Sequence, residues 1–179
     1  MAAEPFTPLK GHCTCKITTY EVLAPFLCTN CCHCTCCQRE SGAAFAINCI
    51  IESSNFRITS QTKPIITNLP TASGNGQKIA RCPNCYVVIA CDYGGDFTWT
   101  TFVKGGTLDD KSKKKVKPEV HIYTTTKLGW INLTNEKERG IPILEASYKA
   151  AQVWRKDALE RFEALKQKMK KAEEASKYP

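Results

Sequence analysis

The sequence predicts a mainly β protein that ends in one long amphipathic helix. Between about residues 11 and 133, short segments rich in Ile, Val, Thr, Tyr and Phe alternate with turn residues, a pattern typical of β-strands. From Leu144 to about Lys177 the chain has neither glycine nor proline and is dominated by Ala, Glu, Lys, Arg and Leu, which favour helix. This change in character divides the chain at about residue 133.

The expected strands, in chain order, are residues 17–22, 44–51, 56–59, 86–90, 97–102 and 120–125. Turn residues separate them at 68–76, 94–95 and 105–106. One short helical turn is expected from Thr35 to Glu40, directly after the densest group of cysteines. The region before residue 133 is therefore expected to consist of short strands joined by turns.

Apolar side chains in the C-terminal segment recur at the three- and four-residue spacing of one helix face. They are Tyr148, Ala151, Ala158, Phe162, Leu165, Met169 and Ala172, with a single break at Arg155. Pro142 lies just before this segment, where proline is tolerated. We expect the stripe to pack on the β domain. The alternative is a homodimer through this helix, since such a seam also suits a coiled coil.

Composition excludes several classes of protein. The 42% apolar and 23% charged residues are ordinary for a globular chain, and no run reaches the roughly 18 apolar residues of a membrane helix. The N-terminus lacks the basic start and apolar segment of a signal peptide, so we expect a cytoplasmic protein, with the nucleus as the alternative. The net charge is +8, and the one dense basic run is Lys111, Lys113, Lys114, Lys115 and Lys117. Because no aromatic residues interleave with these lysines, a solvated loop is favoured over a nucleic-acid contact.

The chain has 12 cysteines, and most of them lie in pairs and tight groups. In a reducing compartment, clustered thiols more often bind metal than form disulfides. Cys82 and Cys85 form a Cys-x-x-Cys pair, the commonest half of a closed zinc site, and Cys13 and Cys15 could supply the other half. Four thiolates from these pairs would saturate one Zn²⁺ and join the two ends of the β region.

A second set, Cys32, Cys34 and Cys37, could converge on another ion. Three protein ligands leave one position of a tetrahedral Zn²⁺ free, which is typical of a site that binds a substrate. Spacing does not fix this set, because Cys28, Cys31, Cys34 and Cys37 also recur at every third residue. The neighbouring pairs Cys31–Cys32 and Cys36–Cys37 are further candidates for redox chemistry, whereas Cys49 and Cys91 are interpreted as buried apolar residues.

Several ordered motifs resemble those of one known family. They are Gly11-His12-Cys13-Thr14-Cys15 with Tyr20, the block from Cys32 to Gly42 (CHCTCCQRESG) with Phe45, Cys82-Pro83-Asn84-Cys85, Gly106-Thr107-Leu108-Asp109-Asp110, and His121-Ile122-Tyr123 leading to Trp130. In their order and approximate spacing they are similar to the glutathione-dependent formaldehyde-activating enzyme family, which also contains centromere protein V. The resemblance covers a domain of residues 9–133 and leaves residues 134–179 as a helical extension.

The resemblance implies a zinc-pinned, mostly antiparallel β-tent-like fold that holds two Zn²⁺ ions per chain. It implies a structural ion on Cys13, Cys15, Cys82 and Cys85, and an open site on Cys32, Cys34 and Cys37. Two positions depart from the family pattern. Tyr86 stands where the family usually has glycine, so the turn there must tolerate a side chain. Cys36 adds a thiol beside the open site.

The function implied by the resemblance is that of a zinc-dependent carbon–sulfur lyase. It would act on a thiol adduct, of the glutathione type, of an aldehyde or other electrophilic carbon, with the thiolate bound at the open site. His121 is a secondary candidate for moving the proton, with a structural histidine as the alternative; the ring of His33 would point away from the metal. The competing hypothesis is a zinc module without catalysis that carries glutathione or binds chromatin or a protein. The expected partner is a small-molecule thiol or thioether.

Overall fold

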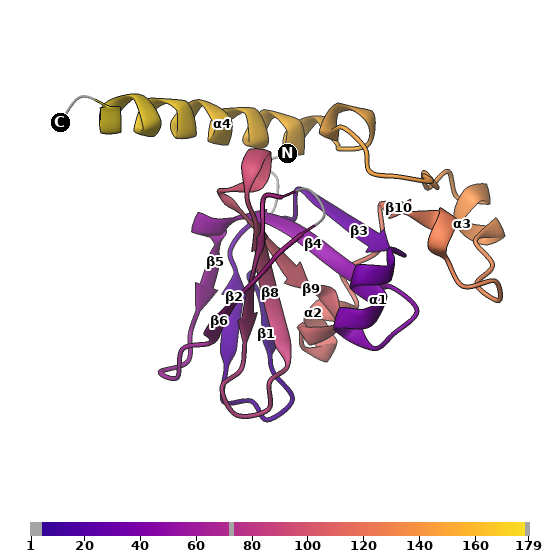
Figure 1. Ribbon diagram of the computed structural model, residues 1–179, viewed down its shortest axis with the longest axis horizontal. Coiled ribbons are helices and arrows are strands. Elements are labelled where there is room, and N and C mark those ends of the chain that lie inside the picture. Colours follow the sequence, from indigo (N-terminus) through magenta and orange to yellow (C-terminus); the bar gives the residue numbers. More distant parts are fainter. Residues whose placement is uncertain (1–4, 72–73, 178–179) are drawn as a thin grey trace.

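The computed structural model describes residues 5–71 and 74–177, and within them the chain forms two β-sheets and one long helix (Figure 1). The smaller sheet is antiparallel and has the strand order β1 (Leu9–His12), β2 (Thr19–Val22), β5 (Phe56–Ile58). This architecture confirms the mainly β class with a C-terminal helix. None of the helices in the described ranges is long and apolar enough to cross a membrane.

The larger sheet has seven strands among the described residues. Their spatial order is β10 (Val120–Ile122), β3 (Cys28–Cys32), β4 (Ala46–Glu52), β9 (Thr100–Lys104), β8 (Val88–Tyr93), β7 (Gln77–Arg81) and β6 (Ile65–Leu69). Neighbouring strands are antiparallel except β10 and β3, which are parallel. At the far edge, the apolar side chains of β6 are exposed, with Ile66 at 58%.

The helices are short apart from the last. They are α1 (Thr35–Ser41), α2 (Asp110–Lys113), α3 (Thr134–Glu138) and α4 (Lys156–Lys177). Single 3-10 turns occupy Ser53–Asn55, Gly95–Phe97, Gly105–Thr107, Thr124–Thr126 and Ala150–Gln152. The predicted helical turn after the cysteine group is α1, which ends at Gly42, whose φ of 63° is the left-handed conformation that glycine accepts without strain.

Each of the six expected strand segments overlaps an observed strand, but four strands were not predicted. These are β1, β3, β6 and β7. The sequence of β3 is Cys-Thr-Asn-Cys-Cys, and all five residues are buried, so the alternation that marks a half-exposed strand is missing. The expected turn at 68–76 begins too early, because β6 continues to Leu69; its residues 72 and 73 lie outside the described ranges.

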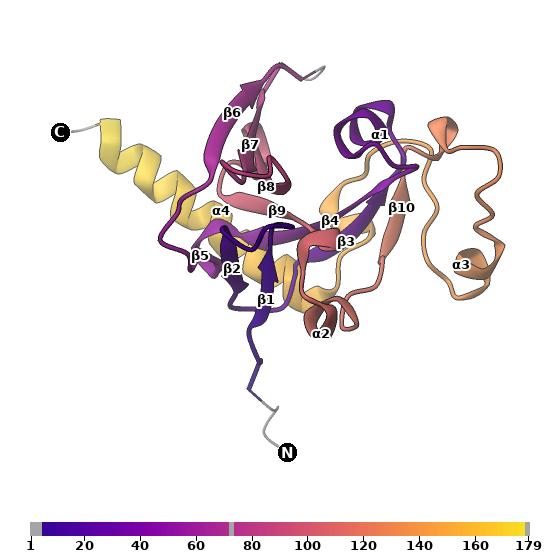
Figure 2. The ribbon, with the colours of Figure 1, turned by 90° about the horizontal axis from the view of Figure 1, so that it is seen from below.

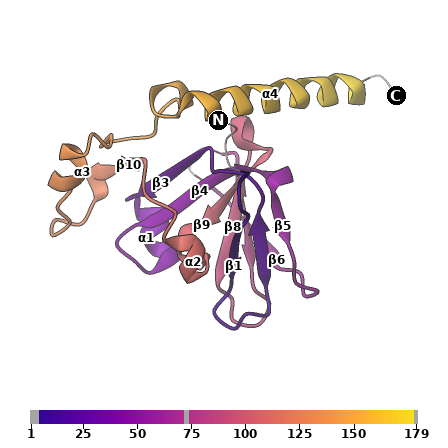
Figure 3. The ribbon, with the colours of Figure 1, turned by 180° about the vertical axis from the view of Figure 1, so that it is seen from behind.

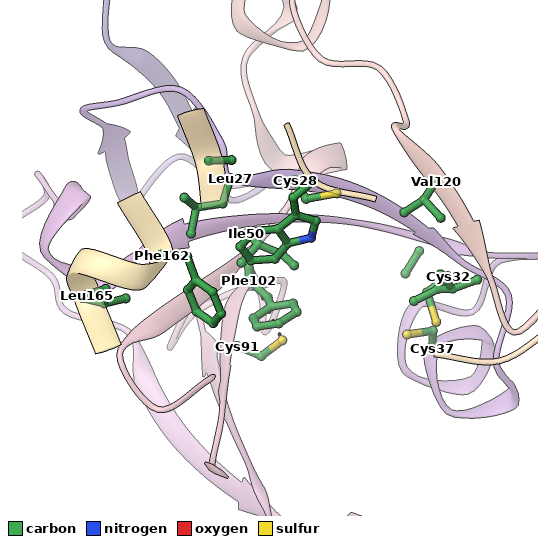
Figure 4. Packing of buried hydrophobic residues seen from close by; sticks show 14 of the residues in the cluster. Leu27, Cys28, Cys32, Cys37, Ile50, Cys91, Phe102, Val120, Phe162 and Leu165 are labelled. Carbon is green, nitrogen blue, oxygen red and sulfur yellow. Dashed lines mark hydrogen bonds between the residues drawn. The ribbon is translucent and has the colours of Figure 1, made fainter. Parts of the chain in front are cut away.

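The large sheet is covered on both faces, and β4 shows the division. Cys49 and Ile51 join a buried cluster that includes Tyr20 and Val22 of the small sheet. Ile50, between them, belongs to a second cluster on the opposite face, in which the apolar side chains of α4 take part (Figure 4). Figure 2 shows α4 lying across the strands on that face. The core therefore has two layers, and successive residues of β4 serve each in turn.

The helix expected from Leu144 begins only at Lys156, so this boundary was wrong. Leu144 instead bonds to the backbone of the edge strand β10: its N–H donates to the His121 carbonyl (2.9 Å). The chain thus returns from α3 to α4 past β10 (Figure 3). The indole of Trp154 donates to the Tyr148 hydroxyl (3.0 Å), which donates to Asn30 Oδ1 of β3 (2.6 Å). These tertiary contacts override the helix propensity of residues 144–155. The division of the chain at residue 133 stays a prediction.

The predicted apolar stripe packs on the β domain in part: Tyr148 and Ala151 precede α4, and Ala151 and Ala172 are exposed. Ala158, Phe162 and Leu165 are buried, and Met169 packs against them. Beside the stripe, Arg161 forms a two-pronged ion pair with Glu52 at the end of β4 (2.9 and 2.5 Å). The face that could serve as a dimer seam is therefore used within the chain, and self-association through α4 stays an untested alternative.

Replacement of Phe162 should test how much α4 contributes to stability. We expect Phe162→Ala to lower the free energy of unfolding by about 3 kcal/mol, because it leaves a cavity between the helix and the sheet. Urea denaturation followed by circular dichroism measures this change. Lys168→Ala, on the exposed face of the same helix, is the control and should change it by less than about 0.5 kcal/mol. Equal free energies of unfolding for the two variants would contradict the packing of Phe162 against the sheet.

Candidate metal centres

Two turns, one from each sheet, bring four thiols together. Cys13 and Cys15 follow β1, and Cys82 and Cys85 follow β7; their sulfur atoms all lie within 4.8 Å of one another. The Cys13 and Cys15 sulfurs are 3.5 Å apart, and those of Cys15 and Cys82 are 3.6 Å apart. In a tetrahedral zinc site with Zn–S of about 2.3 Å, neighbouring sulfurs are about 3.8 Å apart. The donor set and its spacing therefore fit a closed zinc site.

Both turns are tightened by a residue in the left-handed conformation. Lys16 has φ of 61° and Tyr86 has φ of 57°. The N–H of Lys16 donates to the Cys13 carbonyl, and that of Tyr86 donates to the Cys82 carbonyl, each at 3.0 Å. Tyr86 is 63% exposed, so the turn accommodates its side chain by directing it to solvent. The Thr18 N–H also donates to the Cys13 sulfur (3.3 Å).

A second group of thiols lies where β3 passes into α1. Cys32 ends β3, Cys34 is the N-cap of α1 and Cys37 lies in its first turn; the three sulfurs are within 4.8 Å of one another. Figure 4 shows the sulfurs of Cys32 and Cys37 directed toward one another. Among the described residues, no fourth cysteine, histidine or carboxylate completes this group. It therefore offers three ligands where the first group offers four.

Hydrogen bonds among these thiols favour one thiolate. Donation from Cys32 and Cys37 lowers the pKa of Cys34 to about 2, helped by the Cys37 backbone N–H at 3.3 Å. The same hydrogen bond raises the pKa of Cys32 to about 12, and the pKa of Cys37 is also raised. Of the three thiols, Cys34 is therefore the one that ionises most readily.

A polar network supports the Cys37 sulfur, and sequence analysis missed it. Asn48 Nδ2 donates to Cys37 Sγ (3.8 Å), while Asn48 Oδ1 accepts from the Lys104 ammonium (3.1 Å). The Lys104 ammonium in turn forms an ion pair with Glu40 Oε1 (3.0 Å), and both side chains are largely buried. These residues lie on β4, β9 and α1, so no local pattern in the sequence could have shown that they meet.

The remaining candidate residues form a third group. Cys31 and His33, together with His121 of β10, place one ligand atom each within 4.8 Å of the others. The His33 ring therefore lies with these residues, on the far side from Cys32 and Cys34, as expected. Burial, reinforced by the nearby His121, lowers the pKa of His33 to about 4, and burial lowers that of His121 against the opposing effect of Glu136. The alternation of Cys31 and His33 along β3 is the sequence signal that could have revealed this group.

A cleft of about 460 Å³ opens beside α1. Its lining residues are Thr35, Gln38, Arg39, Gly42, Ala43, Ala44, Leu128 and Trp130. Gln38 ties its walls together by donating to the carbonyls of His33 (2.7 Å) and Thr126 (2.9 Å). Thr35 and Gln38 directly follow Cys34 and Cys37 in the chain, although none of the three cysteines lines the cleft. The Trp130 side chain is 74% exposed at its rim.

Comparison with known proteins places the chain in a family. A crystal structure of a Rhodobacter sphaeroides protein is similar over 75% of this chain and 99% of that one, with 18% identity and a TM-score of 0.45. No curated protein matches the chain. The sequence model described as glutathione-dependent formaldehyde-activating enzyme matches residues 8–126, which hold the two thiol groups and the third group of Cys31, His33 and His121. Since the match spans most of the chain, the protein belongs to the glutathione-dependent formaldehyde-activating enzyme family.

Proposed function

We propose that the protein is a zinc-dependent carbon–sulfur lyase that acts on adducts between a thiol and an aldehyde or other electrophilic carbon. The observation that carries this proposal is the difference between the two thiol groups. Cys13, Cys15, Cys82 and Cys85 provide a full set of four ligands, whereas Cys32, Cys34 and Cys37 provide three. Structural zinc sites are closed, and sites that bind a substrate keep one position free. Membership of a family named for a glutathione-dependent activity supports the same reaction class.

In the proposed reaction, the carbon–sulfur bond of the adduct breaks and its electron pair stays on sulfur. In a hydroxymethyl-type adduct, the hydroxyl group loses its proton as the carbonyl forms, so the products are a thiol and an aldehyde. Cys32, Cys34 and Cys37 would hold Zn²⁺, which when bound supplies Lewis-acid stabilisation of negative charge on sulfur. Asn48 and Lys104 keep Cys37 in place by the hydrogen bonds described above.

The cleft beside α1 supports a substrate larger than the reacting carbon. Glutathione-type thiols carry carboxylates, and the guanidinium of Arg39 in the cleft is suited to pair with one of them. Trp130 offers an apolar surface at the rim. Two of its lining residues, Thr35 and Gln38, directly follow Cys34 and Cys37, so we propose that a bound thiol reaches from the cleft toward the three sulfurs. His121 stays a secondary candidate for the proton, although it lies with Cys31 and His33 rather than with these sulfurs.

The direct test is turnover. Zinc-loaded protein should accelerate the cleavage or formation of a glutathione–formaldehyde adduct, followed by proton NMR of the adduct methylene signal. Arg39→Ala should raise the KM for the glutathione adduct more than the KM for an adduct of a thiol without carboxylates, because only the first loses an ion pair. Absence of catalysis across a panel of thiol adducts would contradict the proposal.

A zinc module that binds nucleic acid is the second candidate function, and one observation favours it. All five lysines of the run from Lys111 to Lys117 are exposed, on α2 and the loop that follows. A phosphate-binding patch would give DNA binding that falls steeply with salt. A gel-shift titration across salt concentrations separates the two functions, since a lyase needs no such dependence.

A further inference from the structure

The two faces of β3 carry different groups of ligands. Cys32, and Cys34 beyond the strand end, lie on one face with the proposed open site. Cys31 and His33 alternate with them and so lie on the opposite face, where His121 of the parallel strand β10 pairs with Cys31. The residues of this second group, Cys31, His33 and His121, are 2%, 0% and 5% exposed. Apart from the secondary proton role considered for His121, this group has no part in the reaction proposed above.

The distances within the group approach those of a metal site. Cys31 Sγ lies 3.7 Å from His33 Nε2, which lies 3.0 Å from His121 Nδ1. Around a tetrahedral Zn²⁺, a thiolate and an imidazole nitrogen are about 3.6 Å apart, and two imidazole nitrogens are about 3.4 Å apart. A shift of a few tenths of an ångström between the two rings would therefore admit an ion.

Three buried polar atoms around the group have no hydrogen-bond partner among the described residues. They are His33 Nδ1, His121 Nε2 and Glu136 Oε2. Unsatisfied buried polar atoms are rare in folded proteins and call for a cause. Glu136 Oε2 stands 3.8 Å behind His121 Nε2, on the side away from Cys31. A carboxylate behind a metal-ligating histidine is a recurring arrangement that fixes the ring and its tautomer.

We propose that Cys31, His33 and His121 bind a further metal ion of the Zn²⁺ type, with Glu136 orienting His121. Thiolate and imidazole ligands together suit Zn²⁺ among the available divalent ions. On binding, the Cys31 thiol releases its proton to solvent. The proton shared between His33 Nε2 and His121 Nδ1 moves to the other nitrogen of the ring that carries it. That nitrogen is Nδ1 in His33, or Nε2, which faces Glu136, in His121. The Cys31 thiolate then offsets one positive charge of the ion, and the Glu136 carboxylate, which also pairs with Arg139 (3.0 Å), offsets part of the other.

The ion would join β10 to β3 across a pairing of only three residues on each strand.

Zinc X-ray absorption spectroscopy of untagged protein, loaded in imidazole-free buffer, tests this site directly. The first two thiol groups contain sulfur ligands alone, so they give no imidazole scattering. For the unaltered protein we expect three zinc ions per chain and an imidazole signal. For His121→Gln we expect two zinc ions per chain and no imidazole signal. Two ions and no imidazole signal in the unaltered protein would overturn the proposal, as would an imidazole signal that His121→Gln leaves unchanged.

A gentler variant keeps the test valid if His121→Gln misfolds. Glu136→Gln leaves all three ligands in place and should weaken binding of the third ion by about 10- to 100-fold, measured by competition with a chelator. Glu138→Gln, an exposed position on the same helix α3, is the matched control and should leave that affinity unchanged. Equal affinities in both variants would overturn the role of Glu136. Because the count of ions is independent of turnover, this proposal and the lyase proposal fail separately.

Discussion

Cys34→Ser is expected to abolish carbon–sulfur lyase activity, with a loss of at least about 1,000-fold in kcat/KM. Cys34 caps α1 and is one of the three thiols of this group. A serine hydroxyl at this position supplies no thiolate, so zinc would be lost from the group. Lewis-acid stabilisation is worth several kcal/mol, and about 4 kcal/mol corresponds to the stated loss. The adduct cleavage assay and zinc content measure the two effects, and we expect one zinc fewer per chain.

The matched control for this variant is Cys36→Ser. Cys36 lies on the same helix, is exposed and belongs to none of the three groups of ligands. We expect this variant to keep both its activity and its zinc. The circular dichroism spectrum of Cys34→Ser should match that of the unaltered protein, since the four-thiol group is untouched. A Cys34→Ser protein as active as the original would show that the proposed mechanism is wrong.

Cys82→Ser is expected to have the largest effect on stability. The four-thiol group joins the turn after β1 in the small sheet to the turn after β7 in the large one. Structural zinc contributes about 10–16 kcal/mol in small zinc-binding peptides, against a total stability of about 5–15 kcal/mol for a domain. Loss of about 5 kcal/mol would lower the melting temperature by about 10–20 °C. Thermal denaturation followed by circular dichroism measures it, and treatment with a strong chelator should bring the unaltered protein toward the same value.

Cys49→Ala provides the comparison for Cys82→Ser. Both cysteines are 0% exposed and belong to the same buried cluster, but Cys49 lies outside every group of ligands. Removal of its sulfur leaves only a small cavity, for which we expect a cost of about 1 kcal/mol. If both variants melted at the same temperature, the four-thiol group would have no special role in holding the sheets together.

The two thiol groups could be proposed from sequence because their ligands occur in short pairs. Cys82 and Cys85 lie within one turn, and Cys32, Cys34 and Cys37 lie within one strand end and one helical turn. Local spacing therefore indicates which cysteines could share an ion, and the family resemblance selects among the alternative sets of cysteine ligands. By contrast, His33 and His121 are 88 residues apart and meet only because β10 pairs in parallel with β3. No periodic pattern reports such a non-local pairing.

The same reason explains the errors in the fold. The stripe through Phe162 and Leu165 follows helical spacing, so its packing could be predicted. The start of α4 could not, because Leu144 bonds to the backbone of β10 instead of continuing a helix. Strand β3 escaped prediction because burial on both faces removes the alternation of polar and apolar residues.

The two ends of the large sheet differ in how they meet other molecules. Ile143, preceding Leu144, forms a β-bridge with His121 of β10. This bridge covers that edge of the sheet and hinders pairing with a strand of another molecule. At the opposite margin, β6 presents the uncovered apolar residues Ile65, Ile66 and Leu69. Backbone groups on an unshielded margin recruit further strands, which is how many proteins aggregate. Aggregation of concentrated samples should therefore involve β6, and Ile66→Lys should reduce it without altering any metal ligand.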